Sequence, residues 1–91
     1  AHGQVAGADF TIAQKNKAFS VRQIPIKVGD RITFVNSDSV THNLLSETKG
    51  AEFDIRQPPG RSDTVRFTQP GTVVVECSIH PDMRLEVLVR Q

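Results

Sequence analysis

Residues 73–89 read VVVECSIHPDMRLEVLV. An apolar side chain recurs at every second position in both halves of this stretch. These positions are Val73, Val75 and Cys77 in the first half, and Leu85, Val87 and Val89 in the second. A period of two residues is typical of a β-strand, whereas an amphipathic helix repeats every 3.6 residues. The stretch therefore predicts two strands joined by a short loop that begins near Cys77.

The same alternation continues through the rest of the chain. It links Phe10 with Ile12, Phe19 with Val21, Ile24 with Ile26 and Val28, Ile32 with Phe34, Phe53 with Ile55, and Val65 with Phe67. Turn-forming residues separate these segments at 29–30, 36–39, 49–50, 58–60 and 70–71. Pro25 interrupts a segment that otherwise resembles a strand, so we expect an edge strand or a bulge there. We therefore predict one all-β domain, residues 1–91, with seven or eight short strands in a β-sandwich or a small barrel.

The composition excludes several functional classes. Hydrophobic residues make up 37% of the 91 residues and charged residues 23%, which is typical of one globular domain. The net charge is only +1, whereas a protein that binds nucleic acid through its charge has a strongly basic face. No apolar run reaches the roughly 18–20 residues of a membrane span. The single cysteine excludes an internal disulfide and a Cys-rich zinc framework.

Three potential metal ligands lie within seven residues of one another. Cys77, His80 and Met83 stand at positions i, i+3 and i+6. A second histidine, His42, lies 35 residues upstream of Cys77 at the end of a predicted strand and is followed by Asn43. Two imidazoles and a thiolate in one plane, with a weak thioether on the axis, are the ligand set of a blue copper site. This mixed set suits both Cu(I) and Cu(II), so on a rigid scaffold little has to move when an electron comes or goes.

Other interpretations exist for each of these residues. By itself, Cys77 would be a small buried residue at the end of an inward-facing strand, and Met83 would fill a gap in the core. A zinc site is a further alternative, but a thioether is a poor zinc ligand. The combination of these two residues with His80 and His42 favours copper.

The sequence resembles the cupredoxins, the family of plastocyanin, azurin and pseudoazurin, over nearly the whole chain. The matching segments are IKVGDRITFVN at residues 26–36, His42-Asn43, Pro70-Gly71-Thr72 and the strand that ends at Cys77. The short C-x2-H-x2-M loop is most similar to that of the amicyanins. The resemblance implies a Greek-key β-sandwich and one type 1 copper per chain. The copper ligands that it implies are His42, Cys77, His80 and Met83.

The resemblance also implies roles for residues around the metal. Asn43 is expected to brace the loop that carries Cys77, with neighbouring backbone N–H groups bonded to the sulfur. Ser78 and Pro81 are expected beside the ligands, and Pro81 would fix the orientation of the His80 ring.

These expectations lead to a predicted function. The protein is expected to be a one-electron carrier, not an enzyme, that docks transiently with redox proteins, a dehydrogenase or a cytochrome, near His80. A copper-delivery protein is the alternative. An enzyme with a second copper would need further histidines, and only His2 remains. We also expect a monomer without a nucleic-acid partner, in the periplasm or another exported space, because a start at Ala1 is what signal cleavage leaves.

Overall fold

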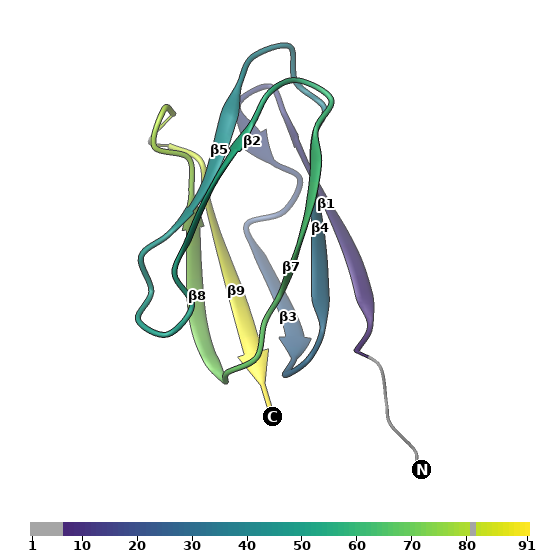
Figure 1. Ribbon diagram of the computed structural model, residues 1–91, viewed down its shortest axis with the longest axis vertical. Helices are drawn as coiled ribbons and strands as arrows, with labels where there is room; N and C mark the ends of the chain where they lie inside the picture. The colour runs from purple at the N-terminus through teal and green to yellow at the C-terminus, as the bar shows by residue number, and fades with distance from the viewer. Residues whose placement is uncertain (1–6, 81) are drawn as a thin grey trace.

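The computed structural model describes residues 7–80 and 82–91, which form two β-sheets (Figure 1). The first sheet contains β1 (Asp9–Lys15), β2 (Ala18–Phe19), β4 (Arg31–Asn36) and β7 (Ser62–Arg66). The second contains β3 (Gln23–Lys27), β5 (His42–Ser46), β6 (Phe53–Gln57), β8 (Gly71–Glu76) and β9 (Arg84–Arg90). The predicted all-β sandwich is confirmed. The described residues form nine strands instead of seven or eight, and one of them, β2, has only two residues.

Five of the eight connections between consecutive strands pass from one sheet to the other, whereas β1–β2, β5–β6 and β8–β9 each stay within one sheet. The strand orders are β2-β1-β4-β7 and β3-β9-β8-β5-β6. Two neighbouring pairs, β1 with β4 and β3 with β9, are parallel, and parallel neighbours need a crossover connection. β3 is an edge strand, and its Pro25, which has no N–H to donate, is exposed there. This confirms the edge-strand prediction for Pro25.

Inward-facing side chains of both sheets form one hydrophobic core. Its members include Ile12, Ile32 and Phe34 from the first sheet, and Leu44, Val73, Val75, Leu85 and Val87 from the second. The alternation also includes Val21 and Val28, but these side chains are 42% and 40% exposed. Both residues lie just beyond the end of a strand, where the backbone turns and the two-residue period stops. Within the described part of the chain, no helix is long and apolar enough to cross a membrane.

The strand pairing brings three distant segments to one end of the sandwich. β5 begins at His42, β8 ends at Glu76, and the two strands run antiparallel with Leu45 opposite Glu76. The loop from β8 to β9 therefore leaves the second sheet beside the first residue of β5. In Figure 1 this end is at the top, and the turn between β1 and β2 lies there too.

Candidate metal centre

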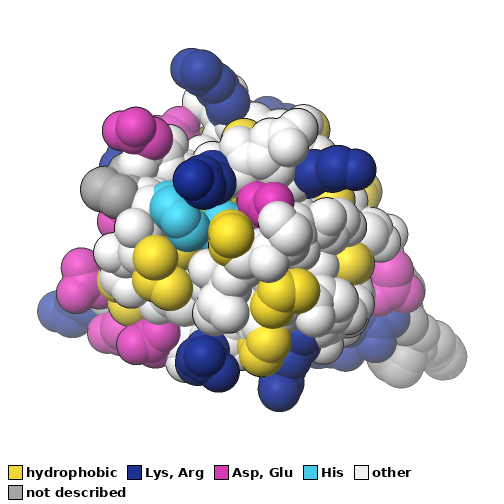
Figure 2. Space-filling model, turned by 90° about the horizontal axis from the view of Figure 1, so that it is seen from above, with side chains coloured by type: hydrophobic (Ala, Val, Ile, Leu, Met, Phe, Trp, Pro, Cys, Tyr) yellow, Lys and Arg dark blue, Asp and Glu magenta, His cyan; other side chains and the backbone are white. Residues whose placement is uncertain are grey.

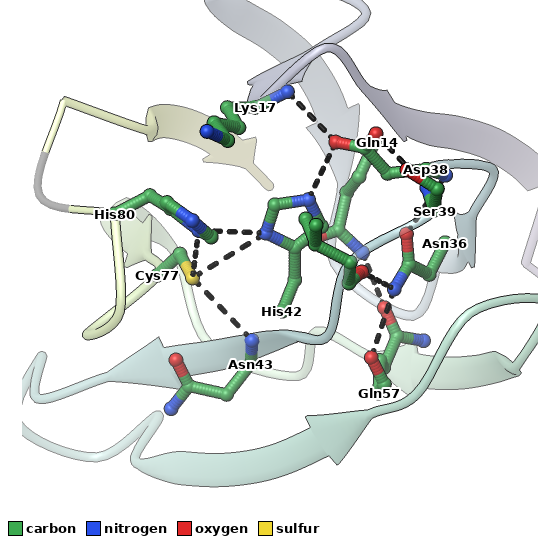
Figure 3. A network of polar contacts seen from close by, with 11 residues as sticks. Gln14, Lys17, Asn36, Asp38, Ser39, His42, Asn43, Gln57, Cys77 and His80 are labelled. Carbon is green, nitrogen blue, oxygen red and sulfur yellow. Dashed lines mark hydrogen bonds and ion pairs between the residues drawn. The ribbon is translucent and has the colours of Figure 1, made fainter.

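Three side chains meet at this end of the sandwich. His42, the first residue of β5, and Cys77, which directly follows β8, are 0% and 1% exposed, whereas His80 in the loop is half-buried. The Sγ of Cys77 lies 3.7 Å from Nδ1 of His42 and 3.8 Å from Nδ1 of His80. The two Nδ1 atoms are 3.1 Å apart (Figure 3). The potential ligand atoms of the three residues thus all lie within 4.8 Å of one another.

These separations fit a single metal ion. Ligand atoms about 2.0–2.3 Å from one ion and roughly 120° apart lie about 3.5–3.7 Å from each other. The two distances between sulfur and nitrogen, 3.7 and 3.8 Å, match this spacing, and the distance between the nitrogens, 3.1 Å, is somewhat shorter. Two imidazoles and a thiolate form a soft to borderline donor set that suits copper.

Met83 lies inside the same end of the molecule. It is 1% exposed and immediately precedes β9. Its backbone N–H donates to the carbonyl of His80 at 3.0 Å, which closes the loop over this segment. The prediction for Pro81, that it orients the His80 ring, concerns a residue outside the described ranges.

Asn43 joins the two chain segments that carry the ligands. Its backbone N–H donates to the Sγ of Cys77 at 3.4 Å, and its Oδ1 accepts from the backbone N–H of Ser78 at 2.7 Å and from the Ser78 hydroxyl at 3.0 Å. Its Nδ2 donates to Asp54 at 2.9 Å. The structure thus brings Asn43 and Ser78 together beside the sulfur, and the start of β5 is tied to the loop after β8.

Asp38 is a neighbour of the site that the sequence interpretation did not include. Its Oδ2 lies 2.9 Å from Nε2 of His42, on the side of the ring that faces away from Cys77. This hydrogen bond, followed by one from the backbone N–H of Lys17, lowers the pKa of the Asp38 carboxyl to about 2. The sequence places Asp38 in a turn, and its position four residues before a histidine was the one signal that could have pointed to this contact.

A group of buried polar side chains supports the loop that carries Asp38. Asn36 donates to the carbonyls of Val40 and Gln57 at 2.9 and 2.8 Å, and it accepts from the Asp38 N–H at 3.0 Å. Gln57 accepts a hydrogen bond from Gln14 and donates to the carbonyl of Phe34. Asn36, Gln57 and Gln14 are each 0% exposed. The segment before His42 is therefore held by the interior of the sandwich.

The surface next to the half-buried His80 includes an exposed apolar side chain. Ile79 is 53% exposed, the largest value among the large hydrophobic residues that the structure describes. Viewed from this end, a histidine side chain reaches the surface beside hydrophobic side chains, with Lys or Arg and Asp or Glu side chains around them (Figure 2).

Comparison with known proteins identifies the family. Residues 6–90 match the copper-binding proteins of the plastocyanin/azurin family. The chain belongs to this family. Copper is therefore the cofactor of this cupredoxin, and the three converging ligand atoms, with Met83 buried beside them in the loop, fit a type 1 site.

Individual relatives include two amicyanins. The cupredoxin is 33% identical over 75 residues to amicyanin-alpha of Methylorubrum extorquens, and the match covers 78% of this chain and 63% of the relative. It is 39% identical over 62 residues to the methylamine utilization protein MauL of the same organism, covering 66% of this chain and 54% of the relative. It is 27% identical over 94 residues to amicyanin of Paracoccus denitrificans, covering 98% and 71%. The chain thus spans less than two thirds of the first two relatives.

Solved structures share the fold. An amicyanin variant in its Cu(I) form has a TM-score of 0.77 and 25% identity, with 96% of this chain and 87% of that chain covered. A purple cupredoxin from Nitrosopumilus maritimus has a TM-score of 0.75 and 25% identity, covering 87% and 97%. A copper-containing nitrite reductase from Thermus scotoductus has a TM-score of 0.80 and 28% identity, with 89% of this cupredoxin but 22% of that chain covered.

Proposed function

We propose that this cupredoxin is a one-electron carrier that uses one type 1 copper, with His42, Cys77, His80 and Met83 as ligands. The observation that carries the proposal is the convergence of two Nδ1 atoms and one Sγ within 4.8 Å on the end of a β-sandwich. When bound, the copper supplies a centre that changes between Cu(I) and Cu(II).

The protein's part in electron transfer is to hold its ligands still. His42 begins a strand, Cys77 directly follows one, and Asn43 ties the two segments together through Cys77 Sγ and Ser78. Ligands on rigid elements keep their geometry better than ligands on mobile loops. A change of one electron then requires little rearrangement, which makes the transfer fast.

His80 is the proposed route for the electron. It is half-buried, whereas His42 and Cys77 are fully buried, so its ring is the part of the site nearest to a docked protein. The exposed Ile79 next to it offers an apolar contact. Electron-transfer contacts are small and transient, below roughly 1,200 Å² in total. By similarity to the amicyanins, we propose a dehydrogenase as electron donor, a cytochrome as acceptor, and a monomeric carrier.

We propose no catalytic activity for this chain, although one structural neighbour is a nitrite reductase. This chain corresponds to 22% of that enzyme. A reducing enzyme needs a second metal with an open position for its substrate, and besides His42 and His80 the sequence has one histidine, His2.

Copper delivery is the alternative function, and the burial of the site argues against it. A site that hands over its metal needs an accessible ligand, yet His42 and Cys77 are 0% and 1% exposed. Met83 is also the one methionine of the sequence, whereas carriers of Cu(I) use several. Slow loss of copper to a chelator would agree with electron transfer, and rapid transfer would agree with delivery.

The location follows as part of the proposal. The one cysteine of the chain is a proposed copper ligand, so no other thiol is present that an oxidising compartment could oxidise. We propose a periplasmic or otherwise exported protein, and fractionation of the native host tests this.

The experiment that tests the function is replacement of the sulfur ligand. The native protein should bind one copper per chain and show an intense visible band, because thiolate-to-copper charge transfer produces that band. Cys77→Ser should lose it completely, since no other thiol exists. Ser62→Ala, an exposed position in β7 of the other sheet, is the matched control and should keep the band. A blue Cys77→Ser protein, or a colourless native protein loaded with copper, would contradict the proposal.

A further inference from the structure

Asp38 lies directly behind the proposed copper ligand His42. Its Oδ2 is 2.9 Å from Nε2 of His42, and the two side chains are 12% and 0% exposed. Nδ1 of the same ring points the other way, to Sγ of Cys77 at 3.7 Å and Nδ1 of His80 at 3.1 Å. The imidazole of His42 therefore connects a carboxylate on one side with the metal donors on the other (Figure 3).

The chemistry of this contact decides which ring nitrogen of His42 carries the hydrogen. A carboxylate oxygen can accept a hydrogen bond but has no hydrogen to donate. Nε2 must therefore carry the hydrogen and donate it to Asp38. A neutral imidazole has a single N–H, so Nδ1 keeps its lone pair. This is the tautomer in which Nδ1 can bind a metal ion.

The Asp38 carboxylate is itself held in one orientation. The backbone N–H of Lys17 donates to Oδ2 at 2.8 Å, and that of Ser39 donates to Oδ1 at 3.0 Å. The backbone N–H of Asp38 donates to Asn36, the last residue of β4, at 3.0 Å. Lys17 lies in the turn between β1 and β2, where its φ of 59° is in the left-handed region. Two backbone N–H groups thus hold the carboxylate that contacts His42, and the Asn36 side chain holds the backbone of Asp38 itself.

We propose that Asp38 is a positioning residue of the copper site, whose carboxylate selects the tautomer of His42 and strengthens Nδ1 as a donor to Cu(II). The inference rests on the proposed function, in which His42 is a ligand. A hydrogen bond to a carboxylate increases the basicity of a ligating imidazole, and the more highly charged Cu(II) gains more from this than Cu(I).

The expected effect can be expressed as a change in affinity. Loss of such a partner typically weakens metal binding by about 10- to 100-fold. Asp38→Asn should weaken the binding of Cu(II) about tenfold more than that of Cu(I). For a one-electron couple, this difference raises the reduction potential by about 59 mV.

The test compares the native protein with two variants, each loaded with copper. Asp38→Asn removes the charge but keeps nearly the same volume and an oxygen acceptor. Asp9→Asn is the matched control, because it removes the same charge from an exposed ion pair with Arg31 at the opposite end of β1. Voltammetry should show a raised potential in Asp38→Asn alone. NMR of the native Cu(I) protein should show a slowly exchanging Nε2–H of His42, and this hydrogen should exchange faster in Asp38→Asn.

Three results would overturn the role of Asp38. They are an unchanged potential in Asp38→Asn, an equal shift in Asp9→Asn, and a native Cu(I) protein without a protected Nε2–H on His42. The absence of this protected Nε2–H from the native protein would overturn the role of Asp38 even if Asp38→Asn does not fold. The visible band separates the two proposals, since blue proteins with equal potentials contradict the role of Asp38 alone, whereas a colourless native protein contradicts the carrier function.

Discussion

Cys77 is both a buried residue at the end of an inward-facing strand and a potential metal ligand. It continues the inward-facing series of Val73 and Val75, and it is 1% exposed. Its Sγ accepts the backbone N–H of Asn43 at 3.4 Å. A hydrogen bond to a thiolate stabilises its negative charge and thereby reduces the electron density that it offers to the metal. At this residue, the alternation that builds the core also delivers the sulfur to the site.

Met83 is the residue through which the reduction potential should be adjustable. A weak axial thioether favours Cu(I) modestly, and the identity of the axial ligand tunes the potential of blue copper sites. Met83→Gln, which offers a harder oxygen donor, should lower the potential, and Met83→Leu, which offers none, should raise it. Voltammetry of the three proteins measures both shifts. Equal potentials in all three would mean that Met83 is not a ligand.

At the scale of elements, each end of the sandwich is secured by an aspartate that accepts backbone hydrogen bonds. Asp38 ties the β1–β2 turn to the segment before β5 at the copper end. Asp30 has the same role between β3 and β4, where its carboxylate accepts the N–H groups of Lys27 and Ala8, each at 2.8 Å. The loops at both ends therefore depend on ionised carboxylates.

The turn between β3 and β4 should make the fold sensitive to acid through Asp30. The hydrogen bond from Lys27, then that from Ala8, lowers the pKa of Asp30 below its ordinary value of 3.8. A carboxyl with a lowered folded-state pKa contributes stability above its unfolded value, and this contribution is lost as the pH falls from about 4 through the folded value. Asp30→Asn should therefore be less stable than the native protein at pH 6, and the difference should shrink below about pH 4. Urea unfolding at both pH values measures this, and a difference independent of pH would contradict it.

At the scale of the whole molecule, a small net charge and an exposed apolar side chain favour docking through apolar contact over docking through electrostatic attraction. The net charge is +1, and within residues 7–80 and 82–91 the most exposed large hydrophobic side chain is that of Ile79, next to His80. Screening by salt acts on charged surfaces and leaves apolar contacts largely unchanged. We therefore expect association through the end that carries His80 to respond weakly to ionic strength.

Electron self-exchange between two copies of the protein tests this surface without an identified partner. Ile79→Ser should slow self-exchange about five- to tenfold, because a loss of about 1 to 1.4 kcal/mol of apolar contact in the encounter corresponds to that factor. Its colour and potential should stay those of the native protein. Val28→Ser, an exposed valine beside the β3–β4 turn at the other end, is the matched control. A self-exchange rate that falls steeply with salt, or that is unchanged in Ile79→Ser, would contradict an apolar docking surface.

Much of this architecture could be predicted from the sequence because the information is local. The pleat of a strand turns successive side chains to opposite faces, so alternation at residues 73–77 and 85–89 was sufficient to predict two strands. Pro25 indicated an edge strand because it lacks a backbone donor. The spacing of Cys77, His80 and Met83 within one loop is equally local, and together with His42 it predicts copper.

The sequence by itself determined the fold class and the candidate donor set, and the tertiary structure alone decided how these residues meet. Nothing in the local pattern pairs Gln14 with Gln57, which lie 43 residues apart. Nor does it place the Asp38 carboxylate beside Nε2 of His42. In the sequence such residues resemble ordinary turn and surface positions. Alternation tells which face a side chain occupies but not which strand lies opposite, and buried polar groups find their hydrogen-bond partners only when the two sheets pack.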